Sequence, residues 1–288
     1  MAGRLCLITI NGPPRAIGII MPFMPQQLAE KALQESRSFG VRRIPMLRPL
    51  GWLAKGFSDL RACPLPGLIH GLAMAVAGLL LVLNTHDQFW LLASAFSAFL
   101  IVAPVVATGL YAVSRAIDRG EPAGLRTALA AWHPRDARLV IFGLLLGLAA
   151  TGWILTSAAL ITSLAHAPVR TPLDFIRVVV LDETNWLFEV WLGVGALLAA
   201  PVFASSVIAI PMLLDREIGI LGAVFTSWRV VMEHPLPMAM WAGLIMALTL
   251  LGMATGLLGL IVIVPWVAHA SWHAYRDLVS ANRHPERR

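Results

Sequence analysis

Residues 68–84, LIHGLAMAVAGLLLVLN, and residues 89–114, FWLLASAFSAFLIVAPVVATGLYAVS, decide the fold. Neither stretch contains Asp, Glu, Lys or Arg, and only the turn THDQ separates them. About twenty consecutive apolar residues are enough to cross the hydrocarbon core of a bilayer as a helix. The sequence therefore predicts two transmembrane helices joined by a short turn.

The composition agrees with a membrane protein. Hydrophobic residues make up 58% of the 288 residues and charged residues only 13%, and the mean hydropathy is +0.76. A soluble domain carries about a quarter charged residues, so most of this chain faces lipid or itself. The lipid bilayer is the expected partner, with other membrane proteins or a second copy of the chain as further candidates, and we expect no nucleic-acid partner.

Two more helix pairs follow along the chain. Residues 139–165 and 187–214 form one pair. Residues 238–275 would make a single helix about 57 Å long, nearly twice the hydrocarbon thickness of about 30 Å. Three glycines lie near the middle of this stretch, in LLGMATGLLGL (250–260). We therefore expect two short helices joined by a tight turn.

The basic residues predict the orientation, because Lys and Arg favour the cytoplasmic side of a membrane. Eighteen of the 22 Lys and Arg residues lie in residues 31–67, 115–138 and 215–237 and in the carboxyl-terminal tail. The opposite connections contain only Arg170 and Arg177. This bias predicts six spans with both termini in the cytoplasm.

Three parts of the chain follow from this pattern. We expect a disordered cytoplasmic arm over residues 1–44, a six-helix transmembrane domain over residues 45–279, and a basic cytoplasmic tail over residues 280–288. The cysteines Cys6 and Cys63 are far apart in the sequence, and we expect no disulfide between them.

The three helix pairs resemble one another. Each second helix contains a proline followed by a charged exit: Pro104 before Arg115 and Asp118, Pro201 before Asp215 and Arg216, Pro265 before Arg276 and Asp277. A segment that precedes each first helix has an aromatic residue at a comparable place: Phe57, Trp132 or Trp228. Two of these segments run into the similar turns CPLPGL (63–68) and HPLPMA (234–239). The expected fold is an all-α membrane protein whose six transmembrane helices form three parallel, pseudo-repeated hairpins, each preceded by an interfacial amphipathic helix.

The first of these segments, LGWLAKGFSDLRA (50–62), shows the helical spacing most clearly. Leu50, Leu53, Phe57 and Leu60 predict an apolar face, and Lys55, Ser58, Asp59 and Arg61 predict a polar one. Such a helix fits the headgroup plane of the membrane, and an ordinary connector helix without a function of its own is the alternative.

One connection on the opposite side predicts a short helix. Thr171 suits an N-cap, Pro172 the first helical position and Asp174 the first turn. We expect this helix to lie on the outer surface.

Histidines provide the candidate metal site. His269 and His273 lie four residues apart, on one face of a helix, and His70 is expected at a similar depth. Together these residues could bind copper, zinc or a haem. We favour the other interpretation, a membrane interface, since Trp266 and Trp272 lie beside the two histidines. No residue is predicted to be catalytic.

Three stretches resemble the domain-of-unknown-function 2189 family of prokaryotic integral membrane proteins: GFSDLRACPLPGLIHGL (56–72), IPMLLDRE (210–217) and HASWHAYRDLV (269–279). The resemblance covers about residues 45–279 and implies a protein of the bacterial inner membrane. Some members of that family are labelled as cytochrome c oxidase subunits.

The expected function is a non-enzymatic one, because no Asp, Glu, Lys or Arg lies deep within a predicted span. We expect a scaffold or assembly partner, or a passive transport element, without a cofactor. The alternative hypothesis is a haem- or metal-handling, redox-associated protein related to cytochrome c oxidase, in which His70, His269 and His273 bind the haem or copper.

Overall fold

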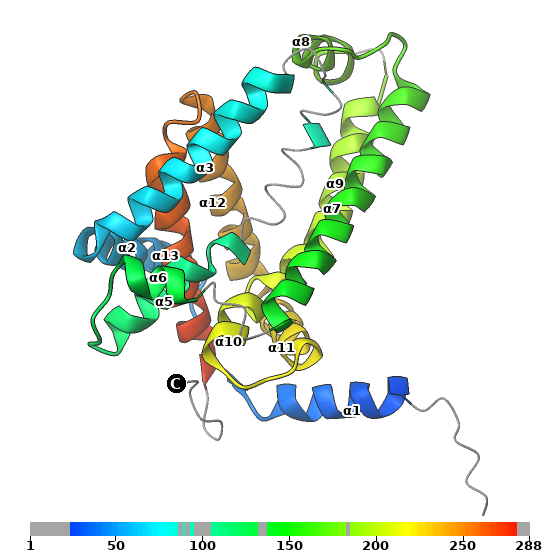
Figure 1. The fold of residues 1–288 in the computed structure, drawn as a ribbon. Coiled ribbons are helices and arrows are strands. Elements are labelled where there is room, and N and C mark those ends of the chain that lie inside the picture. Colours follow the sequence, from blue (N-terminus) through cyan, green and yellow to red (C-terminus); the bar gives the residue numbers. More distant parts are fainter. Residues whose placement is uncertain are drawn as a thin grey trace, which may run out of the picture.

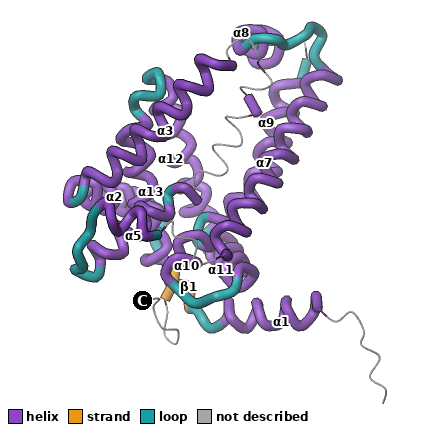
Figure 2. Tube along the Cα trace, in the orientation of Figure 1, coloured by secondary structure: helices purple, strands orange, loops and turns teal. Residues whose placement is uncertain are grey.

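The computed structural model describes residues 24–85, 89, 93–94, 105–131, 137–182 and 185–280. Helices make up nearly all of the regular structure in these ranges, as Figure 2 shows. One pair of two-residue strands, β1 (Gly40–Val41) and β2 (Val279–Ser280), is antiparallel. The all-α class predicted from the sequence is confirmed.

Four helical segments of the described ranges are long and apolar enough to cross a membrane. They are Pro64–Asn84 within α3 (Pro64–Thr85), α7 (Ala137–Leu164), the combined α9 (Leu187–Ser206) and α10 (Ala209–Asp215), and α12 (Pro235–Ala254). Each coincides with a predicted span. The second predicted span, residues 89–114, lies mostly outside the described residues, and α5 (Thr108–Asp118) covers its end.

The long apolar stretch after residue 238 divides into two helices, as predicted. α12 ends at Ala254 and α13 (Leu260–Leu278) begins six residues later. Gly256 and Leu257 between them have φ angles of 65° and 72°, a region that glycine adopts easily and leucine rarely. α13 is not among the apolar spans, because His, Ser, Arg and Asp residues lower the hydropathy of its second half.

The turn between α12 and α13 is fixed by hydrogen bonds and by packing. The Thr255 hydroxyl donates to the Gly252 carbonyl and accepts from the Gly259 N–H, each at 2.8 Å. Leu257 is 8% exposed and packs against Gly78 of α3. These contacts hold the strained Leu257 backbone in place.

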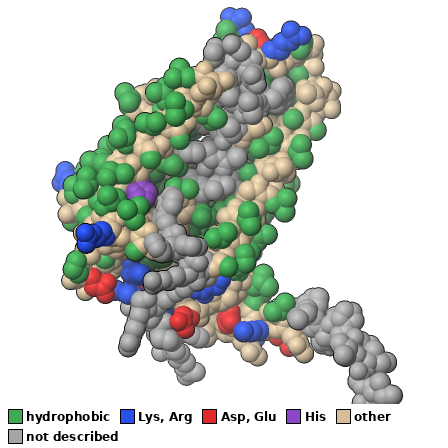
Figure 3. Space-filling view, viewed as in Figure 1, with side chains coloured by type: hydrophobic (Ala, Val, Ile, Leu, Met, Phe, Trp, Pro, Cys, Tyr) green, Lys and Arg blue, Asp and Glu red, His purple; other side chains and the backbone are tan. Residues whose placement is uncertain are grey.

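The connections that contain most of the Lys and Arg residues lie at one end of the molecule, which we call the base (Figure 1). The base consists of α1 (Met24–Arg37), α2 (Arg48–Ala62), α5, α6 (Leu125–Ala130), α10 and α11 (Ile220–Glu233). Figure 3 shows a largely apolar side surface between a charged base and a few charges at the far end.

Two turns at the base have the same geometry. Cys63 ends α2 with φ −139° and ψ 73°, and His234 ends α11 with φ −131° and ψ 56°. In each turn the backbone N–H donates to the carbonyl four residues earlier, Asp59 or Val230. A proline then begins the next helix, α3 or α12. The similarity of CPLPGL and HPLPMA therefore extends to the backbone.

Residues 24–37 of the amino-terminal arm form the helix α1, where the sequence predicts disorder. α1 packs against α11, and Ala32, Ser36 and Phe39 are buried there. Arg229 of α11 donates to the Ser36 carbonyl at 2.8 Å and also to the Phe39 carbonyl. Partners about 190 residues away order this segment, so its own composition does not reveal the order.

The connection from α7 to α9 lies at the end opposite the base and begins with the predicted short helix. α8 (Pro172–Phe175) continues into one π-helical turn, η1 (Ile176–Val180). The Thr171 side chain accepts from the Asp174 N–H, and the Asp174 carboxylate accepts from the Thr171 N–H. This reciprocal pair is a capping box, which confirms the predicted N-cap.

Candidate functional site

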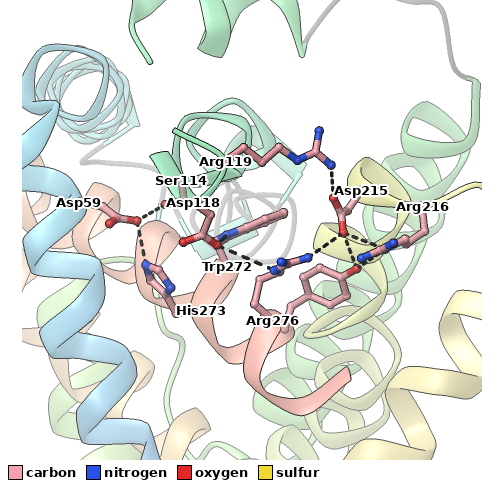
Figure 4. A network of polar contacts seen from close by, with 10 residues as sticks. Asp59, Ser114, Asp118, Arg119, Asp215, Arg216, Trp272, His273 and Arg276 are labelled. Carbon is pink, nitrogen blue, oxygen red and sulfur yellow. Dashed lines mark hydrogen bonds and ion pairs between the residues drawn. The ribbon is translucent and has the colours of Figure 1, made fainter. Parts of the chain in front are cut away.

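Side chains from four helices meet in one polar network at the base (Figure 4). We call it the basal network and define it by Asp59 of α2, Ser114, Asp118 and Arg119 of α5 and its end, Asp215 and Arg216 of α10 and its end, and His269, Trp272, His273, Tyr275 and Arg276 of α13. The stretches that carry the family resemblance, GFSDLRA, IPMLLDRE and HASWHAYRDLV, therefore converge on one place.

The first half of the basal network centres on Asp59, which is 6% exposed. Its Oδ2 atom accepts a hydrogen bond from the Ser114 hydroxyl at 2.6 Å and lies 2.8 Å from Nε2 of His273. The Ser114 oxygen lies 2.8 Å from Nδ1 of His269. A carboxylate, a hydroxyl and two imidazoles thus form one buried chain across α2, α5 and α13.

The second half centres on Asp215, whose side chain is fully buried. It lies 3.2 Å from Arg119, 2.9 Å from Arg216 and 3.8 Å from Arg276. The Tyr275 hydroxyl donates to its Oδ2 atom at 2.8 Å. A buried carboxylate needs this many partners to offset the loss of hydration.

Asp118 connects α5 to Trp272 and Arg276 of α13. Its Oδ2 atom accepts from the Trp272 indole N–H at 2.7 Å and lies 3.9 Å from Nε of Arg276. Arg276 therefore contacts both Asp118 and Asp215. The three charged exits recognised in the sequence, at the ends of α5, α10 and α13, are brought together.

A further contact ties α2 to the end of α13. Asp277 accepts from Arg48 at 3.0 Å and from the Trp52 indole at 2.9 Å. The hydrogen bond to Asp277 raises the pKa of Arg48 above its usual value. Gly56 allows this close packing, because a Cβ there would lie 2.5 Å from the Ala270 backbone nitrogen.

Two of the three predicted ligand histidines belong to the basal network. His269 is fully buried and His273 is 7% exposed. Among the described residues, no group of three or more His, Cys, Asp or Glu side chains is arranged to hold a metal ion. The metal site at His70, His269 and His273 stays a prediction.

His70 lies on α3. Its Nδ1 atom lies 2.8 Å from the Pro66 carbonyl oxygen. α3 packs closely on α13 at Gly67 against Pro265 and at Gly71 against Ile261. This antiparallel register puts the His70 backbone about 10 Å from the level of His269 along the helix axes, so the backbones of the three histidines do not share one depth.

Asp59 is the residue that sequence reasoning misplaced, because we expected it on the polar face of α2. The buried residues of α2 are Pro49, Trp52, Leu53, Gly56, Asp59 and Leu60. They form a stripe at helical spacing that includes Asp59 and leaves Leu50 48% exposed. The glycine one turn earlier was the available signal, since it marks a close helix contact.

The fold and the surface define a helical integral membrane protein. Residues 91–215 match the sequence model of a family described as "Predicted integral membrane protein (DUF2189)", which confirms the resemblance over this part of the chain. The matched segment includes Ser114, Asp118 and Asp215. Comparisons with curated proteins and with solved structures found no match.

Proposed function

We propose that the chain is a six-pass protein of the bacterial inner membrane with both termini in the cytoplasm. The four apolar segments supply four of the passes. The second predicted span supplies another, and α13, which returns from the far turn to the base, supplies the sixth. The excess of Lys and Arg in the basal connections supports a cytoplasmic base.

The packing of the basal helices supports a threefold pseudo-repeat of hairpins. α6 packs on α5, and α11 packs on α9 and α10, so each basal helix contacts the second helix of the preceding pair. α2, the basal helix of the first pair, packs on α13 of the last pair. The contacts thus close a ring, and the three charged exits meet inside it in the basal network.

The role that we propose is a non-enzymatic scaffold or assembly partner for other membrane helices. One observation carries this proposal. In the most apolar stretch of α7, only 17% of the residues are buried by the rest of the chain, whereas 50% are buried in the corresponding stretch of α9 and α10. Leu144 and Leu148 of α7 are each 70% exposed. A Cβ at Gly147 or Gly152 would meet nothing within 4 Å. Small residues on an open helix face allow a second helix to approach closely.

Photocrosslinking in native membranes tests the scaffold. A benzoylphenylalanine at Leu148 is expected to give a discrete protein adduct, either with a second copy or with another membrane protein. The matched control is Leu80 of α3, which is 54% exposed on a helix whose Gly71 and Gly78 are already covered. Lipid contact alone would leave both positions without a protein adduct, and that result would contradict the proposal.

The passive transport role stays a prediction from the sequence. The haem- or metal-handling role is a second candidate, because His269 and His273 lie buried within one polar cluster. It predicts a Soret band or stoichiometric copper or zinc in purified protein, lost when His269 and His273 are changed to Ala. A colourless, metal-free preparation from supplemented cells would contradict this candidate.

A further inference from the structure

The basal helix α2 lies across α13 instead of along it. Arg48 in the first turn of α2 lies 3.0 Å from Asp277, and Asp59 near its end lies 2.8 Å from His273. The two α2 residues are about 16 Å apart along their helix, whereas their two partners are only about 6 Å apart along α13. α2 therefore crosses α13 at a large angle. Where α13 spans the membrane, as we propose, α2 lies close to the membrane plane.

The two edges of α2 suit different surroundings. On one edge the Trp266 indole donates to the Leu53 carbonyl at 2.7 Å, and the Phe57 and Trp266 rings are 5.5 Å apart. Leu50 continues this edge at helical spacing and is exposed. Lys55 is exposed on the opposite edge. One edge of α2 is therefore apolar and the other is polar, as in a helix at a membrane interface.

The exposed charges of α2 and of the residues just before it are all positive. Lys55 and Arg61 are exposed on the helix, and Arg42 and Arg43 are exposed in the connection that precedes it. The one carboxylate of α2, Asp59, is buried and accepts from Ser114. This surface therefore attracts anions, and a lipid with a negatively charged headgroup is the anion that a membrane supplies.

Arg61 lies at the depth where lipid headgroups are expected. The apolar span of α3 begins at Pro64, three residues later. The Arg61 guanidinium lies 4.4 Å from the centre of the Phe57 ring, which orients it. Leu65 and Leu72 follow on α3, two turns apart on one face, and both are exposed. A cation for a headgroup and an apolar surface for acyl chains thus lie next to each other.

We propose that α2 and the start of α3 form a binding site for an anionic phospholipid. The Arg61 guanidinium donates to the lipid phosphate, because its paired N–H groups match the geometry of phosphate oxygens. Lys55 and the arginines before α2 attract the negative headgroup from the water side. The acyl chains pack beside Leu65 and Leu72. A zwitterionic phospholipid has no net charge and binds this site more weakly.

Native mass spectrometry of the detergent-purified protein tests the site. The probes are phosphatidylglycerol and phosphatidylcholine with identical acyl chains, added in equal amounts. The wild type is expected to retain phosphatidylglycerol in preference to phosphatidylcholine. Arg61→Gln should lower this preference roughly tenfold, because it removes a charge-assisted contact with the phosphate. Arg61→Lys, which keeps the charge but loses the paired N–H groups, should retain part of the preference.

The matched control is Arg37→Gln, because Arg37 is an exposed arginine in the last turn of α1 and belongs to the same end of the molecule. It makes the same change in charge and should leave the preference unchanged. Inorganic phosphate alone should give no adduct, because it lacks the acyl chains. Equal retention of the two lipids by the wild type, an equal loss in Arg37→Gln, or a phosphate adduct in place of the lipid would overturn the proposal.

Discussion

The Tyr275 hydroxyl donates a 2.8 Å hydrogen bond to Asp215, a carboxylate that is fully buried and lies sixty positions earlier in the chain. Asp215 ends α10 and Tyr275 belongs to the last turns of α13, so this bond joins two of the three charged exits. Arg119, which follows α5, reaches the same carboxylate. One side chain therefore holds the basal ends of three helices.

Replacing Asp215 should destabilise the protein strongly. In Asp215→Asn, Arg119, Arg216 and Arg276 lose their shared countercharge, and we expect the free energy of unfolding to fall by about 3 kcal/mol. Tyr275→Phe removes one hydroxyl and should cost about 1 kcal/mol. Thermal unfolding in detergent measures both, with the exposed Glu189→Gln as control. Equal losses for the two variants would argue against Asp215 as the shared centre.

Cys63 reports the side of the membrane on which the base lies. In a Cys6→Ser background, a membrane-impermeant maleimide should label Cys63 only from the cytoplasmic side. Burial raises the pKa of the Cys63 thiol, and its Sγ atom lies 3.6 Å from the Ala123 carbonyl. Its thiolate therefore forms at a higher pH than that of a free cysteine, so labelling should be slow at neutral pH and faster as the pH rises.

The matched control for Cys63 is Pro168→Cys in the Cys6→Ser, Cys63→Ser background. Pro168 is exposed and lies at the end opposite the base, just after α7. It should react only from the periplasmic side. Labelling of both positions from the same side would contradict the six-pass arrangement.

Much of the fold could be predicted because it depends on local patterns. The break between α12 and α13 follows from a length limit and from Gly256, which stands at one of the two positions of this turn with a positive φ angle. The N-cap of α8 follows from Thr171, Pro172 and Asp174, which lie within one turn. The basal network could not be predicted in the same way, because Asp59 meets Ser114 55 residues away and His273 214 residues away. A helical pattern shows which stripe is buried but not which partner makes a buried carboxylate acceptable.

The α8 cap gives a prediction about pH. A backbone hydrogen bond from Thr171 lowers the pKa of Asp174 below its usual value. The stabilisation of α8 by the ionised Asp174 carboxylate is therefore fully present above the ordinary pKa of an aspartate. It is lost as the pH falls through the lowered pKa. The NMR shift of the Asp174 amide, 3.1 Å from the Thr171 hydroxyl oxygen, should follow this titration. Asp174→Asn should abolish it, and a midpoint at the ordinary value would contradict the cap.

Close contact between α3 and α13 gives the last prediction, with a control in the same chain. A Cβ at Gly71 would overlap the Ile261 carbonyl group, which belongs to the backbone and cannot turn aside. Gly71→Ala should therefore push α3 away from α13 and lower the free energy of unfolding by about 1–3 kcal/mol. Gly147→Ala on α7 meets nothing within 4 Å, and its higher helix propensity should change stability by no more than about 1 kcal/mol. Chemical unfolding in mixed micelles compares the two variants. If Gly71→Ala were as stable as Gly147→Ala, α3 and α13 could not pack backbone to backbone, and α13 would lose the support that positions His269 beside Ser114.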